Sequence, residues 1–70
     1  MSKTLEELGY EKEDILNIRR EKIGIRFSDE DNAQIINIYY KDKTFDKHYA
    51  RFTAEELKAI YKWCEDNKWI

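Results

Sequence analysis

The chain has 70 residues, of which 41% are hydrophobic and 40% charged, and its formal net charge is −2. This length predicts a single domain over residues 1–70, near the lower size limit for folding alone. The charge balance lacks the basic surplus that is typical of non-specific DNA binding. No stretch reaches the ~20 apolar residues of a membrane helix, no signal-peptide pattern is present, and Cys64 is the only cysteine. We therefore expect a cytoplasmic protein, without a disulfide of its own and without a membrane partner.

The first expected element is a short helix over residues 4–9. Thr4 and Glu7 have the spacing of a capping box. Gly9 is a natural stop, because glycine readily adopts the left-handed conformation that ends many helices. Residues 11–14, with the sequence EKED, are expected to form a charged connector.

The middle of the chain has the alternation of apolar and polar residues that indicates β-strands. Alternation at residues 16–19 and 23–27 predicts two strands with a turn at residues 21–22, or one merged strand. The sequence SDEDN that follows is typical of a turn. Two further strands are expected in the segment richest in β-branched and aromatic residues and in its hairpin partner, residues 34–40 and 44–52.

Residues 53–67 carry the clearest helix signal. Thr53 and Glu56 form a second capping box, and Ala59 and Trp63 widen the apolar surface beyond one stripe. The stripe expected to pack on the sheet consists of Leu57, Ile60, Tyr61 and Cys64. The sequence thus predicts an α+β fold, with an antiparallel meander sheet of three or four strands, a short N-terminal helix and a packed C-terminal amphipathic helix.

One face of the sheet is a candidate binding surface. If Ile36 and Ile38 face the helix, the residues between them lie on the opposite, open face. We expect rings and cations there, a composition that binds single-stranded nucleic acid by stacking and phosphate contacts. The residues of this alternative site are Tyr39, Lys41, Lys47, Tyr49 and Arg51. The same residues also suit ordinary cross-strand pairs, and a register shift of one residue exchanges the two faces.

Catalytic and metal-binding patterns are absent from the sequence. His48 is the only histidine, and Cys64 falls on the helix stripe, where a cysteine usually serves as a small buried hydrophobe. The acidic groups lack the spacing of a calcium loop, and no glycine-rich phosphate loop occurs. We therefore expect no catalytic residue, no metal site and no cofactor.

A protein interface is the use that best fits this size, acidity and lack of chemistry. Aromatic residues are favoured anchors of interfaces. We expect an aromatic patch with an acidic rim that imitates nucleic-acid charge towards a basic partner. The expected anchors are Tyr39, Tyr49 and Trp63, and the expected rim is Asp29, Glu30 and Asp31.

Three segments, LEELGYEKED, INIYYKDKTF and ELKAIYKWCEDNKWI, resemble small uncharacterised proteins encoded in phages and prophages of Gram-positive bacteria. Those proteins combine a short first helix, short strands and a last amphipathic helix ending near a Trp, so the resemblance implies the same α+β fold. Where relatives often end this helix with Leu-Gly-Trp, this chain has Asp-Asn-Lys-Trp, and Asn67 is expected at the left-handed position. No catalytic residues carry over, because the family's role is not established.

The resemblance also implies a biological context. Small acidic phage proteins frequently bind host proteins, including components of antiviral defence such as CRISPR effectors. We expect a non-enzymatic phage or prophage protein that binds and modulates a host protein in the bacterial cytoplasm, including as an anti-CRISPR-like inhibitor. It would act as a monomer or a homodimer. The alternative function is binding of single-stranded nucleic acid.

Overall fold

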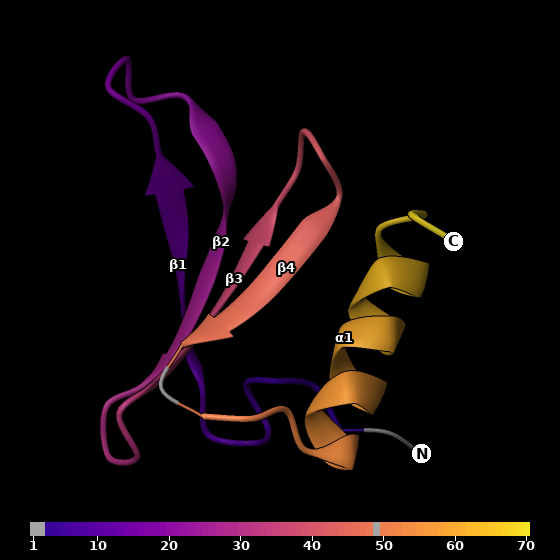
Figure 1. Ribbon diagram of the computed structural model, residues 1–70. Coiled ribbons are helices and arrows are strands. Elements are labelled where there is room, and N and C mark those ends of the chain that lie inside the picture. The colour runs from indigo at the N-terminus through magenta and orange to yellow at the C-terminus, as the bar shows by residue number, and fades with distance from the viewer. Residues whose placement is uncertain (1–2, 49) are drawn as a thin grey trace.

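The computed structural model describes residues 3–48 and 50–70 (Figure 1). In this part of the chain, four strands are followed by one helix: β1 (Glu11–Leu16), β2 (Lys22–Asp29), β3 (Gln34–Tyr39), β4 (Thr44–His48) and α1 (Ala54–Asp66). The strands form one sheet in the order β1-β2-β3-β4, and each neighbouring pair is antiparallel. The expected α+β meander is therefore confirmed, with four strands.

The N-terminal segment forms a single hydrogen-bonded turn where a short helix was expected. Both bonds of the capping box are present, since Thr4 N donates to Glu7 Oε1 (2.9 Å) and Glu7 N donates to Thr4 Oγ1 (3.1 Å). Gly9 has φ 104° and ends the turn, and Tyr10 N donates to the carbonyl of Leu5. The capping box and the glycine stop both form as predicted, but they lie so close together in sequence that no second helical turn fits between them.

The prediction of a charged connector at residues 11–14 is wrong, because these residues form most of β1. β1 lies at an edge of the sheet, where charged side chains are tolerated and discourage pairing with other molecules. The turn to β2 falls earlier than expected and is built around Asn17. The Asn17 side-chain oxygen accepts hydrogen bonds from the backbone N–H groups of Arg19 and Glu21, both at 2.9 Å.

The core lies between α1 and one face of the sheet. Ile25 is paired with Ile38, and Phe27 with Ile36, so the four side chains lie on the same face. Ile36 and Ile38 therefore face the helix, as the sequence analysis assumed, and Tyr40 packs against the same core. The buried hydrophobic residues are Leu5, Tyr10, Ile25, Phe27, Ile36, Ile38, Ala59, Ile60 and Cys64.

The helix begins as predicted but presents a different side to the sheet. Thr53 is the N-cap, and the capping box with Glu56 is present. Leu57 and Tyr61, expected in the core, are 49% and 60% exposed. Ile60 and Cys64 are buried as predicted, and Glu56 and Ala59 are buried beside them in place of Leu57 and Tyr61. The stripe was misplaced because the apolar surface of α1 is wider than the core requires, and the inward side includes a glutamate.

The C-terminal end of α1 also differs in detail. Asn67 is the C-cap with φ −97°, and Lys68 takes the left-handed conformation expected for Asn67, with φ 60°. Trp69 N then donates to the carbonyl of Cys64 at 2.8 Å. This bond closes the helix end and brings the Trp69 ring back onto the core.

A close approach of two strands requires a glycine at position 24. A Cβ added at Gly24 would lie 2.2 Å from the carbonyl oxygen of Ile38 on β3. We expect Gly24→Ala to lower the free energy of unfolding by about 1–3 kcal/mol, because the strands must separate to admit the methyl group. Urea denaturation measures this change, with Ser28→Ala on the same strand as the control. A Gly24→Ala protein as stable as the wild type would contradict the register of β2 against β3.

Candidate functional site

The structure divides the ring-and-cation site between two faces of the sheet. Tyr39 pairs with Thr44 and lies on the open face. Lys47 pairs with Ile36, a core residue, so its side chain points towards α1, where it contacts Glu56. The expectation that Lys47 shares the open face with Tyr39 is therefore wrong, because the register of β4 is shifted by one residue from the expected register.

The other residues of that alternative site are also dispersed. Lys41 is exposed in the turn between β3 and β4, and Arg51 is exposed in the segment that leads to α1. The Arg51 carbonyl accepts a hydrogen bond from Lys47 Nζ at 2.7 Å. Tyr49, an expected anchor in both hypotheses, lies outside the residues that the structure describes.

Trp63 belongs to an aromatic cluster on the helix side of the sheet. Its ring stacks on Tyr40, with centroids 6.5 Å apart and planes 3° from parallel. Trp69 meets it edge-on, with centroids 4.8 Å apart. Tyr39 lies on the opposite face of the sheet, so Tyr39 and Trp63 do not form one patch.

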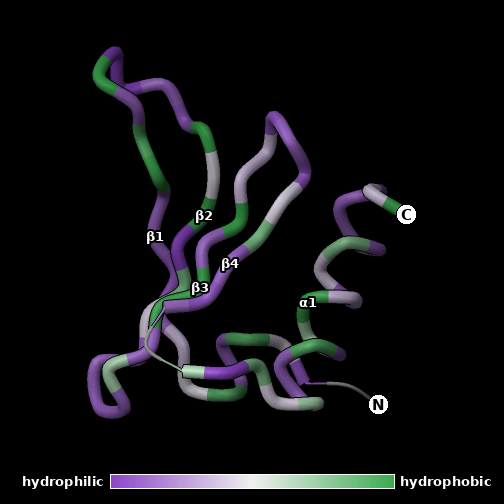
Figure 2. Tube along the Cα trace, viewed as in Figure 1, coloured by the Kyte–Doolittle hydropathy of each residue, from purple (hydrophilic) through white to green (hydrophobic). Residues whose placement is uncertain are grey.

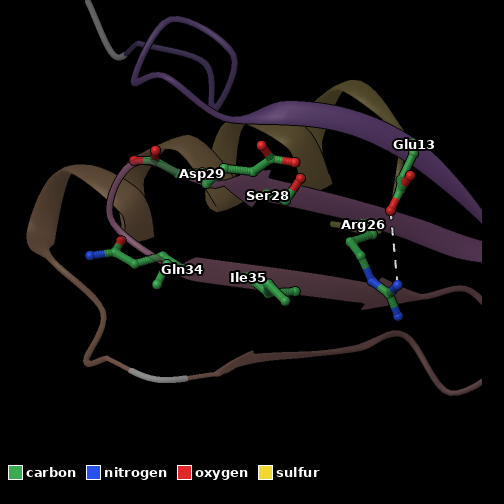
Figure 3. Close-up of a pocket in the computed structure, with 8 residues that line it drawn as sticks. Glu13, Arg26, Ser28, Asp29, Gln34 and Ile35 are labelled. Atoms are coloured by element: carbon green, nitrogen blue, oxygen red, sulfur yellow. Dashed lines mark ion pairs between the residues drawn. The ribbon is translucent and has the colours of Figure 1, made fainter.

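The acidic residues expected as a rim do lie together, at the turn between β2 and β3. Asp29 and Glu30 border a shallow depression of about 410 Å³ on the sheet surface (Figure 3). Glu13 and Arg26 lie in it, with Glu13 Oε1 3.8 Å from a terminal guanidinium nitrogen of Arg26. The full lining is Glu13, Arg26, Ser28, Asp29, Glu30, Ala33, Gln34 and Ile35. Asp31 is exposed beside it, in the same turn.

A row of polar side chains crosses the open face, one from each strand. Arg26 Nε donates to Asn37 Oδ1 at 3.0 Å, and Asn37 Nδ2 donates to Asp46 Oδ1 at 3.1 Å. Glu13 on β1 extends the row through its contact with Arg26. Asn37 is only 3% exposed, yet both ends of its amide have partners. The row therefore fixes the register of the four strands and leaves few open-face polar groups for a ligand.

His48 and Cys64 are not brought together. His48 Nε2 lies 3.5 Å from Asp46 Oδ1 on the open face. Cys64 is buried in the core on the other face, and burial raises the pKa of its thiol. Among residues 3–48 and 50–70, no group of three His, Cys, Asp or Glu side chains is placed to hold a metal ion.

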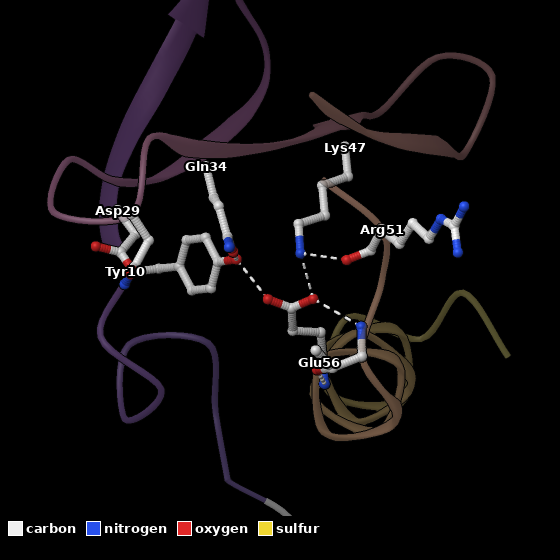
Figure 4. Close-up of polar contacts among 8 residues, drawn as sticks. Tyr10, Asp29, Gln34, Lys47, Arg51 and Glu56 are labelled. Atoms are coloured by element: carbon white, nitrogen blue, oxygen red, sulfur yellow. Dashed lines mark hydrogen bonds and ion pairs between the residues drawn. The ribbon is translucent and has the colours of Figure 1, made fainter. Parts of the chain in front are cut away.

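A buried polar cluster joins three segments of the chain, and sequence reasoning missed it (Figure 4). The carboxylate of Glu56 accepts hydrogen bonds from Lys47 Nζ, from the Tyr10 hydroxyl and from the backbone N–H of Thr53. The Tyr10 hydroxyl also lies 2.7 Å from Gln34 Oε1. The capping box identifies Glu56, but the pairing of Lys47 with the same carboxylate depends on the register of β4.

These contacts control the ionisation of the cluster. Burial alone would raise the pKa of Glu56, but the hydrogen bonds from Lys47, Tyr10 and Thr53 outweigh it and lower the pKa. Burial, together with the bond to Glu56, raises the pKa of Tyr10. The cluster thus holds a lysine cation against a carboxylate, with both side chains almost wholly inaccessible to solvent.

Among the residues that the structure describes, the most exposed large hydrophobic side chain lies at the tip of the β1–β2 hairpin. Ile18 is 99% exposed, and the tip projects beyond the rest of the sheet in Figure 1. Figure 2 shows this tip as a hydrophobic segment next to hydrophilic residues. The turn is held by the Asn17 side chain and by a hydrogen bond from Arg20 N to the Asn17 carbonyl (2.9 Å). The alternating pattern predicts a strand residue here, and only the placement of the turn reveals an exposed apex.

Charge is distributed unevenly between the two ends of the sheet. The meander places the β1–β2 and β3–β4 turns at one end and the β2–β3 turn at the other (Figure 1). The two turns at the Ile18 end carry more basic than acidic side chains: Arg19, Arg20, Lys41 and Lys43 against Glu21 and Asp42. The opposite turn carries Asp29, Glu30 and Asp31. A slightly acidic protein therefore has one basic end.

The buried Lys47–Glu56 pair generates a stability prediction. Lys47→Met or Glu56→Gln alone leaves one charge buried without its partner, and we expect each to lower the free energy of unfolding by about 3–5 kcal/mol. The double variant should lose clearly less than the sum of the two, because neither charge remains. Urea denaturation of the four proteins measures the coupling free energy between the two side chains. Additive losses would show that the two side chains do not interact.

The same pair predicts a dependence of stability on pH. The pKa of Glu56 is lowered from 4.5 in the folded state, so its ionised form contributes stability above that value. The contribution is lost as the pH falls through the lower folded pKa. We expect the difference in unfolding free energy between wild type and Glu56→Gln to be constant near neutrality and to shrink below pH 4.5. A difference independent of pH would contradict the ion pair.

The described surface offers an exposed apolar tip at a basic end, an acidic turn at the other end, and a sheet face whose polar groups bond to one another. No helix in residues 3–48 and 50–70 is long and apolar enough to cross a membrane. Comparisons of the chain with protein-family models, with curated proteins and with solved structures found no match.

Proposed function

We propose that the chain is a non-enzymatic binding protein that uses Ile18 to anchor a partner protein. The observation that carries this proposal is an aliphatic side chain that is 99% exposed on an ordered, projecting turn. Burying an isoleucine side chain contributes about 1.5–3 kcal/mol. Such a residue is unfavourable in water and becomes favourable only when a partner covers it.

The rigidity of the turn supports a role in binding. Asn17 makes four hydrogen bonds within the turn, two through its side chain and two through its backbone groups. A segment ordered before binding loses less conformational entropy when the complex forms. The turn therefore presents Ile18 in a single arrangement that suits an anchor residue.

The charge around the tip suggests the chemistry of the partner. Arg19 and Arg20 are both exposed beside Ile18. We propose that the partner offers an apolar pocket bordered by carboxylates, because complementary charge raises the association rate and excludes other partners. The acidic turn at the opposite end, with Asp29, Glu30 and Asp31, is a second proposed contact, directed at a basic surface.

The identity of the partner as a host protein rests on the resemblance to phage and prophage proteins. We propose that the chain binds and modulates a host protein in the bacterial cytoplasm, including a component of antiviral defence. Tyr39 and Trp63 lie on different faces, so they would serve as secondary contacts. No observation favours single-stranded nucleic acid, because Lys47, one of the expected phosphate contacts, is buried against Glu56.

A pull-down from a Gram-positive host lysate tests the proposal, with nuclease-treated and untreated samples. We expect wild type to retain a defined protein after nuclease treatment and Ile18→Ser to lose at least tenfold of it, which corresponds to about 1.4 kcal/mol. Asp42→Ser, at the neighbouring β3–β4 turn, is the matched control and should retain the protein.

Equal recovery by Ile18→Ser and wild type would refute the anchor. Partners that disappear with nuclease would instead support nucleic-acid binding. Circular dichroism of each variant establishes that a lost partner does not reflect lost folding, since an exposed turn residue contributes little to stability.

A further inference from the structure

The helix α1 has a second apolar side that its own core does not cover. Leu57 and Tyr61 are four residues apart, so they lie next to each other on the helix surface. Both are exposed, and so are the nearby Phe45 of β4 and Ile70. Together they surround a groove of about 230 Å³, lined by Phe45, Leu57, Ile60, Tyr61, Cys64 and Ile70.

No charged side chain lines this groove. The exposed large hydrophobic residues of the described chain number seven, and the four around the groove are a majority of them. A contiguous apolar surface of this kind in a small protein indicates an interaction site. Its occupant must itself be apolar, because a polar group placed there would lose its hydration without gaining a partner.

Two residues of opposite charge lie on the solvent-exposed side of α1, beside Leu57 and Tyr61. Lys58 and Glu65 are seven residues apart, so they lie on one flank of the helix next to Tyr61. Both are exposed, and neither forms an ion pair with another residue of 3–48 or 50–70. By contrast, Lys62 and Asp66, further round the helix, pair with each other at 3.7 Å.

We propose that a second copy of this chain covers the groove, with the two α1 helices antiparallel about a two-fold axis near Tyr61. In that arrangement the two Tyr61 side chains meet at the axis, and Leu57 of each copy lies on the apolar surface about one helical turn (~6 Å) from it. Lys58 of one copy lies opposite Glu65 of the other, and the symmetry makes this pair twice. A parallel arrangement would set Lys58 against Lys58 and Glu65 against Glu65.

The chemistry of the surface favours a second copy over another partner. An interface about a two-fold axis requires a patch that is complementary to itself. An apolar stripe flanked by one cation and one anion at matching distances from its centre meets that requirement. Antiparallel helix dipoles add to the preference, because each positive helix end lies near the negative end of the other helix.

Analytical ultracentrifugation over a range of protein concentrations tests the proposal. We expect wild type to sediment as a monomer–dimer equilibrium and Tyr61→Glu to remain monomeric, since it places a charge at the centre of the interface. Ile18→Glu is the matched control, because it changes an exposed apolar residue far from α1 and should still dimerise. Wild type that stays monomeric at its highest soluble concentration would overturn the proposal.

Charge reversal tests the antiparallel arrangement directly. Lys58→Glu and Glu65→Lys should each weaken dimerisation, by roughly three- to thirtyfold for two surface ion pairs. The double reversal should restore the wild-type dissociation constant, because the pairing is re-formed with exchanged signs. Failure of the double variant to recover, with circular dichroism showing all variants folded, would overturn the arrangement. Loss of the host partner on Ile18→Ser is a separate readout, so the two proposals fail independently.

Discussion

The fold depends on one carboxylate, that of Glu56. It accepts hydrogen bonds from the start of its own helix, from Lys47 on β4 and from Tyr10 near the N-terminus. Three segments that are distant in sequence therefore converge on one buried group. Removing the charge would leave a lysine without a partner in the core, which is why the arrangement allows little variation. The glutamate that caps the helix also determines where the helix lies.

The inward position of Glu56 has a direct effect on the surface. With Glu56 facing the sheet, Ala59, Ile60 and Cys64 follow it into the core on the same side of α1. The remaining apolar residues, Leu57 and Tyr61, are then left towards solvent. On the other face of the sheet, the row centred on Asn37 holds the strands in register. Buried polar contacts hold the fold, and the apolar residues outside it remain exposed to solvent.

The sequence predicted what depends on local pattern and missed what depends on register. The capping box at Thr53 and the alternation of β3 are local signals, and they place α1 and this strand correctly, whereas the capping box at Thr4 marks only a turn. Lys47 was assigned to the wrong face because one residue of strand shift exchanges faces. The first strand was expected at residues 16–19, later than β1 as observed (Glu11–Leu16), because the charges of an edge strand resemble those of a linker. Ile18 looked like a strand residue, and only the turn built by Asn17 showed it to be an apex.

The hairpin tip has a consequence for how the protein can change. Ile18 is not part of the core. Its turn is held by the hydrogen bonds that the Asn17 side chain accepts rather than by the side chains at the apex. Substitutions at Ile18 and Arg19 should therefore change the stability of the fold little, whereas Arg20 has a left-handed backbone conformation (φ 61°) that restricts its replacement. A surface whose side chains lie outside the core can change in sequence while Glu56 and the core stay constant.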